Sequence, residues 1–406
     1  MQFVRTTDLK PGMRLAKPIY NKMGVLLYER DTKLTIQGIN SIENFGLIGS
    51  FILEPAEPVP PLSQEDIEFE QFQTIYMFRL KDCMDRLNAR KAVPALTELT
   101  TGIYQRYGTL DHKLNFTQNL RSSADFVYKH AISAAILSAM LANELQIPQD
   151  DTLSLISAAA LYDFGYLYVP QKILEKGNGL EPGDKDYIQL SLERGFDMIR
   201  PESPALGLSS LALEILQQII FRQSRTVTLK EASPEVKLLC DILIVADKFD
   251  RLTAMNINQP PVSELIAMNY LDKHPETYNP KVVSALANCI HILPTGACLD
   301  FSNGQKGLVI QENPVDYLHP IILNFKDNQL YDLSIPEVRR KLRIVDIMKT
   351  MDNRIKIDEE ALQHFVADEN IKATMEHFRK KRIKLEQLQK QRELKKAAEE
   401  FARRRR

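Results

Sequence analysis

The sequence lacks the features of several protein classes. None of its apolar stretches approaches the roughly 18 uninterrupted apolar residues of a membrane-spanning helix, and Met1 to Lys10 hold no apolar segment of signal-peptide length. The four cysteines lie far apart and form no Cys-x-x-Cys pair, so neither a zinc knuckle nor a disulfide framework is indicated. These absences predict a cytoplasmic protein whose cysteines, Cys83, Cys240, Cys289 and Cys298, are buried and reduced.

The composition that remains is that of a globular protein. Hydrophobic residues make up 44% of the 406 residues and charged residues 26%, which excludes a wholly disordered chain and a collagen-like chain. At roughly 150 residues per domain, a chain of this length is expected to hold two or three domains.

The net charge of -1 is the sum of two opposite regions. Residues 371–406 carry 14 Lys and Arg against five Asp and Glu, a net charge of +9, whereas the preceding residues carry a net charge of -10. Residues 368–406 contain no Gly or Pro and are rich in good helix formers, so we expect one basic helical tail.

Three roles remain open for this tail. It can be a solvated helix without a partner, or it can form a homodimer through apolar heptad positions, although these extend over only about two heptads. It can also make peripheral contact with acidic lipid headgroups. Phe378 and Phe401 are its only aromatic residues, which leaves no strong signal for nucleic-acid binding.

Turn and helix signals predict five regions. Residues 1–56 read as a small β-rich domain in which Thr35 can cap a short helix. A Pro-rich linker follows at 57–66, and residues 67–335 read as a helical domain with a β appendage, where Asn303-Gly304 between apolar runs marks a hairpin. Residues 336–370 are expected to form a helical connection to the tail at 371–406.

Three side chains have the chemistry of metal ligands in helical hydrolases. His130 lies in an Ala-rich helical segment, Asp163 in residues 161–170 and Asp247 in residues 242–253. Phosphodiester hydrolysis at such a site needs His and Asp side chains from several helices, because bound cations must activate water and neutralise phosphate charge. The order and spacing of these residues resemble the HD-GYP family, the bacterial cyclic di-GMP phosphodiesterase branch of the HD phosphohydrolases.

The resemblance extends over most of the chain. Residues 4–53 resemble the small domain that often precedes HD-GYP modules, on the phrases DLKPGM (8–13) and GVLL (24–27). Residues 120–325 resemble the HD-GYP module itself, through LEP (180–182), Gly195 and the segment that runs from Ala246 to Thr253. The resemblance implies a mainly α fold: a helical HD-domain core, a small N-terminal β-rich domain, a short β appendage and a basic C-terminal helix.

The residues of the reaction depart from the family pattern. Active members carry His-Asp followed by Gly-Lys, whereas this chain has Tyr162-Asp163 followed by Gly165-Tyr166. By the resemblance, a further histidine falls near Ser191, and a His-His pair falls near Gln217-Gln218. Of a metal centre with up to about eight side chains, only His130, Asp163 and Asp247 remain, whereas two ions need about six to eight ligand positions.

The sequence therefore predicts a degenerate signalling protein, not an enzyme, that acts as a regulatory or scaffolding module through protein partners. One alternative is a sensor that binds cyclic di-GMP or a related nucleotide without cleaving it, with Tyr162, Tyr166, Gln217 and Gln218 as candidate contacts. The other is a weak phosphodiesterase with one divalent ion on His130, Asp163 and Asp247. No cofactor and no catalytic residue is expected in the leading hypothesis, in which the same three side chains form a buried hydrogen-bonded group.

Overall fold

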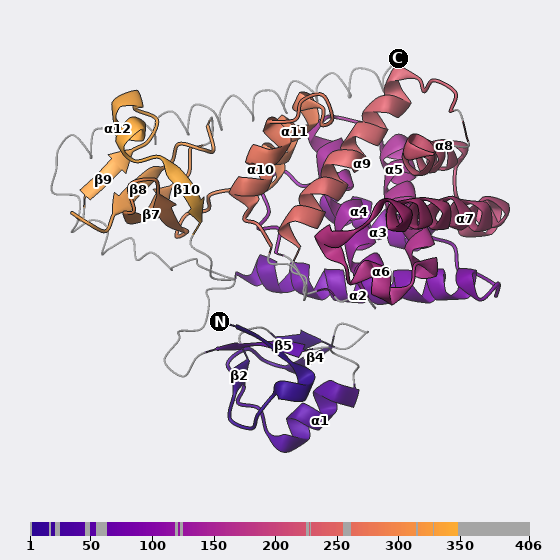
Figure 1. The fold of residues 1–406 in the computed structure, drawn as a ribbon, viewed down its shortest axis with the longest axis horizontal. Coiled ribbons are helices and arrows are strands. Elements are labelled where there is room, and N and C mark those ends of the chain that lie inside the picture. Colours follow the sequence, from indigo (N-terminus) through magenta and orange to yellow (C-terminus); the bar gives the residue numbers. More distant parts are fainter. Residues whose placement is uncertain are drawn as a thin grey trace, which may run out of the picture. The chain divides into compact units, whose positions relative to one another are not determined.

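A computed structural model gives the fold (Figure 1). It describes residues 2–15, 18–20, 25–44, 49–53, 63–117, 121, 125–224, 227, 229–254, 261–313, 316–327 and 329–347. The basic tail predicted at 371–406, most of the connection predicted at 336–370 and most of the linker predicted at 57–66 lie outside these residues.

The N-terminal domain combines short strands with one helix. Strands β1 (Gln2–Arg5), β5 (Gly49–Leu53) and β2 (Arg14–Leu15) form an antiparallel sheet in that order, and β3 (Ile19–Tyr20) pairs with β4 (Leu26–Tyr28). The helix predicted after Thr35 is confirmed as α1 (Ile36–Asn44), and the Thr35 hydroxyl accepts a hydrogen bond from the Gly38 amide at 3.0 Å. Among the described residues of this domain, the buried hydrophobic cluster consists of Leu9, Leu15, Ile19, Leu34 and Ile42.

A helical domain follows and confirms the mainly α fold. Its larger helices are α2 (Gln64–Asn88), α3 (Thr97–Tyr107), α4 (Phe126–Glu144), α5 (Gln149–Leu161), α7 (Pro182–Leu206), α8 (Ser210–Ile220), α9 (Pro234–Thr253), α10 (Glu264–Asp272) and α11 (Pro280–Cys289). The short helices η2 (Phe164–Tyr168) and α6 (Gln171–Leu174) connect α5 to α7.

Helix α4 forms the centre of this domain. Its Ala-, Leu- and Ile-rich sequence is buried from Val127 to Ala142 with few interruptions, because α5, α9, α2, α3 and α11 all pack against it (Figure 1). A helix that is apolar on every side is stable only in the interior. The one His of α4, His130, is therefore fixed in the core.

Two glycines fix η2 against α7. A Cβ atom at Gly165 would lie 2.3 Å from the Ser191 carbonyl oxygen, and one at Gly195 would lie 2.7 Å from the Gly165 Cα atom. Only glycine permits this approach of the two backbones. The contact places Asp163 and Tyr166, at either end of the same turn, relative to the rest of the domain.

The second compact unit of the chain is a five-stranded antiparallel sheet. Its order is β10 (Ile344–Ile347), β6 (Cys298–Phe301), β7 (Lys306–Gln311), β8 (Ile321–Asn324) and β9 (Gln329–Asp332), and α12 (Pro336–Lys341) precedes β10. Gly304 has φ of 76° in the β6–β7 turn, which confirms the predicted Asn-Gly hairpin. Because β10 pairs with β6, the sheet extends past the boundary predicted at 335. The first part of the predicted helical connection thus includes a strand, and the domain division as a whole stays a prediction.

Among the described residues, no helix is both long enough and apolar enough to cross a bilayer.

Candidate functional site

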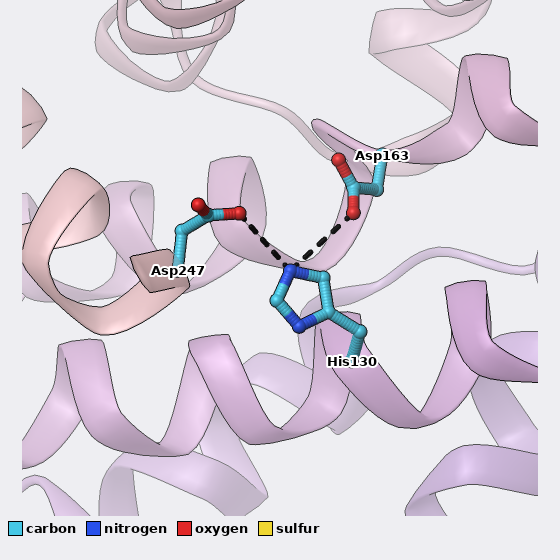
Figure 2. A group of neighbouring side chains, drawn as sticks. All are labelled: His130, Asp163 and Asp247. Carbon is cyan, nitrogen blue, oxygen red and sulfur yellow. Dashed lines mark hydrogen bonds and ion pairs between the residues drawn. The ribbon is translucent and has the colours of Figure 1, made fainter. Parts of the chain in front are cut away.

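Three segments of the helical domain bring His130, Asp163 and Asp247 together. His130 comes from α4, Asp163 follows α5 at the start of η2, and Asp247 comes from α9. Figure 2 shows both carboxylates directed at the same ring nitrogen of the histidine. The His130 Nε2 atom lies 3.0 Å from Asp247 Oδ1 and 3.4 Å from Asp163 Oδ2, and His130 and Asp163 are almost fully buried.

The other ring nitrogen of His130 contacts a second charged pair. Its Nδ1 atom bonds to the Asp250 carboxylate, which also pairs with the Arg121 guanidinium. Arg121 Nη2 donates to Asp250 Oδ1 at 2.7 Å and to the Ser133 hydroxyl at 3.2 Å. Because Asp250 accepts the Nδ1 proton, it fixes the ring so that Nε2 faces Asp163 and Asp247.

Arg251 and Tyr162 complete the Nε2 side of the site. Arg251 Nη2 donates to Asp163 Oδ2 at 2.7 Å, and its Nε atom donates to Asp247 Oδ1 at 2.8 Å. The Tyr162 hydroxyl donates to Asp247 Oδ1 at 2.8 Å and lies 2.7 Å from His130 Nε2. The guanidinium thus bridges the two carboxylates that face the histidine.

The pKa values reflect this pairing. Burial raises the pKa of Asp163, against the opposing effect of Arg251 and His130. Burial also acts to raise the pKa of Asp247, but Arg251 and His130 outweigh it and hold that pKa well below its usual range. The pKa of His130 is raised, because its carboxylate partners, Asp250 and Asp247, outweigh burial and the nearby Arg251, which lower it.

The donor set can be compared with that of a metal site. One ligand atom from each of His130, Asp163 and Asp247 lies within 4.8 Å of the others, close enough for all three to reach one ion. However, the two carboxylate oxygens concerned already accept from Arg251, and the imidazole nitrogen is shared with Tyr162. The three residues converge as metal ligands would. They do not fit a divalent ion in this arrangement, because the Arg251 guanidinium already neutralises the two carboxylates.

A cavity of about 260 Å³ opens beside these residues. Asp163, Asp247, Tyr162, Tyr166 and Arg251 form its polar side. The remaining lining residues are mainly apolar and come from α7, α8 and α9 and the turn after α8: Gln189, Leu192, Ile219, Ile220, Arg222, Leu243 and Ile244.

The structure places the predicted nucleotide contacts in two different surroundings. Tyr162 and Tyr166 line the cavity. Gln217 and Gln218 do not line it: Gln217 is exposed, and the Gln218 side chain donates to the Lys230 carbonyl at 3.0 Å. The register of α8 presents the adjacent Ile219 and Ile220 to the cavity instead.

Sequence reasoning missed three members of the site. Arg251 is one helical turn after Asp247 on α9, a spacing that puts the two side chains on one face, so this i,i+4 pair could have been found. Asp250 is visible in the sequence motif, but its contact with His130 depends on the packing of α4 against α9. Arg121 gives no local signal, because it lies outside any regular element and 129 residues from its partner Asp250.

Comparisons with known proteins relate part of this chain to HD domains. The HD domain family matches residues 115–282. Over 207 residues, the chain is 22% identical to the cyclic di-GMP phosphodiesterase PA4108 of Pseudomonas aeruginosa, which covers 51% of this chain and 49% of that protein. Over 67 residues, it is 34% identical to the cyclic di-GMP phosphodiesterase PdeB of Borreliella burgdorferi, covering 16% of this chain and 18% of that protein. The matches thus span half or less of these relatives.

Among solved structures, the chain resembles Bd1817, an HDG"Y"P protein from Bdellovibrio bacteriovorus, at 14% identity. The likeness covers 70% of this chain and 97% of that one, with a TM-score of 0.37, which is too low to bear on the fold.

The matched residues 115–282 include His130, Asp163 and Asp247, so this site lies in the part of the chain that is similar to HD domains. Part of the chain is similar to bacterial cyclic di-GMP phosphodiesterases.

Proposed function

We propose that this protein is an HD-GYP module that has lost phosphodiesterase activity and acts in signalling as a regulatory or scaffolding component. The observation that carries the proposal is the Arg251 guanidinium, which is hydrogen-bonded to both Asp163 and Asp247. These carboxylates are where the reaction of the family would need a divalent cation.

The chemistry of bond cleavage supports the same proposal. A cation at such a site lowers the pKa of a bound water and draws charge from the phosphate. The Arg251 guanidinium carries one positive charge, but it cannot coordinate or activate water, and its donors are directed at two carboxylates. Tyr162, in place of a histidine ligand, donates a hydrogen bond to Asp247 and leaves no imidazole at that position.

A turnover assay tests this proposal. The purified full chain is incubated with cyclic di-GMP and Mn²⁺, and with a generic phosphodiester, beside the related Pseudomonas phosphodiesterase as a positive control. We expect no more product from this chain than from its Asp163→Ala variant. Turnover that depends on Asp163 would overturn the proposal in favour of a weak phosphodiesterase.

A second candidate function is binding of cyclic di-GMP or a related nucleotide without cleavage. The observation that favours it is the cavity, where apolar walls and the ring of Tyr166 adjoin the guanidinium of Arg222. Aromatic rings stack on bases, and arginines pair with phosphates. Calorimetric titration with cyclic di-GMP tests this candidate, which predicts heat that Arg222→Ala reduces; no heat with the full chain removes it.

A further inference from the structure

We propose that Arg251 is an internal cation that occupies the place of a divalent ion and closes this HD site to metals. The inference deepens the proposed function and rests on it for the view that this site has lost its activity. It concerns metal binding and not turnover, so it can be tested separately.

The hydrogen-bond geometry places the guanidinium on the ligand atoms themselves. Asp163 Oδ2, which faces His130 Nε2 at 3.4 Å, is the atom that accepts from Arg251 Nη2. Asp247 Oδ1, which faces the same nitrogen at 3.0 Å, is the atom that accepts from Arg251 Nε. An ion bonded to both oxygens at about 2.0–2.6 Å would occupy the volume of the guanidinium N–H groups and would be repelled by their charge.

The Arg251 side chain is held in this position from two sides. It leaves α9 one turn after Asp247, and its guanidinium lies 5.4 Å from the centre of the Tyr166 ring, at the distance of a cation–π contact. Its side chain is 33% exposed, whereas that of Asp163 is only 2% exposed. Arg251 therefore closes the solvent side of a carboxylate that has little other access to water.

The buried charges explain why the site needs a cation. A buried carboxylate without a partner is strongly destabilising, and Arg251, at 2.7 Å, lies closer to Asp163 than the His130 imidazole does, at 3.4 Å. Shortening Arg251 removes this charge and opens the volume that it fills. His130, Asp163 and Asp247 then face one another without the positive charge of Arg251. We therefore expect Arg251→Ala to gain affinity for a divalent ion that the wild-type chain excludes.

The test is Mn²⁺ binding, measured on the full chain by electron paramagnetic resonance and by thermal unfolding with and without MnCl₂. For the wild-type chain we expect no bound Mn²⁺ and no shift in Tm. For Arg251→Ala we expect a lower Tm without metal, one bound Mn²⁺ per chain, and a Tm that Mn²⁺ restores. The gain in affinity is expected to be roughly 10- to 100-fold or more, the range by which neighbours of a metal site alter its affinity.

Three further variants serve as controls. Arg222→Ala removes the other arginine of the cavity, for which the described structure shows no bond to either carboxylate, and should leave Mn²⁺ excluded. Arg251→Lys keeps the charge and should also exclude the ion. The double variant Arg251→Ala with Asp163→Asn should lose the Mn²⁺ binding that Arg251→Ala gains. If Arg251→Ala does not fold, Arg251→Gln takes its place in the test.

Two results would overturn the inference. One is stoichiometric Mn²⁺ on the wild-type chain with the affinity of Arg251→Ala, and the other is a folded Arg251→Ala that binds no Mn²⁺. Metal on the wild-type chain without turnover would refute this inference alone, whereas turnover of cyclic di-GMP would refute the proposed function, so the two failures can be distinguished.

Discussion

At the scale of single residues, Tyr162 shows how polar groups of the site are paired with one another. Its hydroxyl lies between His130 Nε2 and Asp247 Oδ1, at 2.7 and 2.8 Å. The Tyr162 oxygen is within hydrogen-bond reach of the imidazole nitrogen, and its hydroxyl donates to the carboxylate. The tyrosine thus gives both groups a hydrogen-bond partner.

Tyr162→Phe tests this contribution. The variant leaves the partly exposed Asp247 carboxylate and the buried His130 imidazole each short of one partner, so we expect the free energy of unfolding to fall by about 1–3 kcal/mol. Urea unfolding followed by circular dichroism measures the change. Tyr187→Phe, at a ring that is 45% exposed, is the matched control and should change stability little. Equal losses in the two variants would contradict the role given to Tyr162.

A second residue-scale prediction concerns pH. His112 lies between Glu65, at 2.6 Å, and Asp111, at 2.9 Å, and hydrogen bonds to these carboxylates, Glu65 first, raise its pKa. Since the folded pKa is above the unfolded one, this stabilisation is complete below about pH 6.5 and is lost as the pH rises through the folded pKa.

The effect is small, because the His112 side chain is 52% exposed and its ion pairs are screened by solvent; we expect roughly a few tenths of a kcal/mol. The measurement is Tm from pH 5.5 to 8.5 for the wild-type chain and for His112→Gln. The difference in Tm between them should shrink as the pH increases. A difference that stays constant or grows would refute the assignment.

At the scale of elements, local patterns predicted most of the fold. The helix after Thr35, the hairpin at Asn303-Gly304 and the run of helices from Glu65 onward all follow from capping, turn and periodicity signals within a few residues. Strand β10 could not be predicted in this way, because its partner β6 lies more than forty residues earlier in the chain. Its pairing depends on the assembled sheet.

The candidate site shows the same division between local and distant information. The convergence of His130, Asp163 and Asp247 was predicted from the motif, and Arg251 follows from an i,i+4 spacing once Asp247 is known. The contact from Arg121 crosses 129 residues of sequence, and the failure of Gln217 to reach the cavity depends on the rotation of α8. Neither has a local signal.

Gly195→Ala tests how η2 is held on α7. The added methyl group would lie 2.7 Å from Gly165 Cα and Gly165 N, so the turn that carries Asp163 must move. We expect a loss of about 1–3 kcal/mol in the free energy of unfolding, the usual cost of overpacking. Gly183→Ala on the same helix, where the Cβ atom would meet nothing within 4 Å, is the control. Unchanged stability in Gly195→Ala would show that the contact is not tight.

At the scale of the whole molecule, two regions of opposite charge share one chain. The helical and β units belong to the part with a net charge of -10, and the tail at 371–406 carries +9. The roles predicted for that tail, as a solvated helix, a dimer contact or a contact with acidic lipid, stay predictions, because it lies outside the described residues. The match to the HD domain family, over residues 115–282, lies in the part with the net negative charge.

The measurement that tests the central claim most directly is an anomalous diffraction map from crystals of the full chain soaked in MnCl₂. The account predicts no manganese peak between Asp163 and Asp247, and density for the Arg251 guanidinium on both carboxylates. One or two manganese peaks bonded to His130, Asp163 and Asp247, with Arg251 turned away, would contradict it.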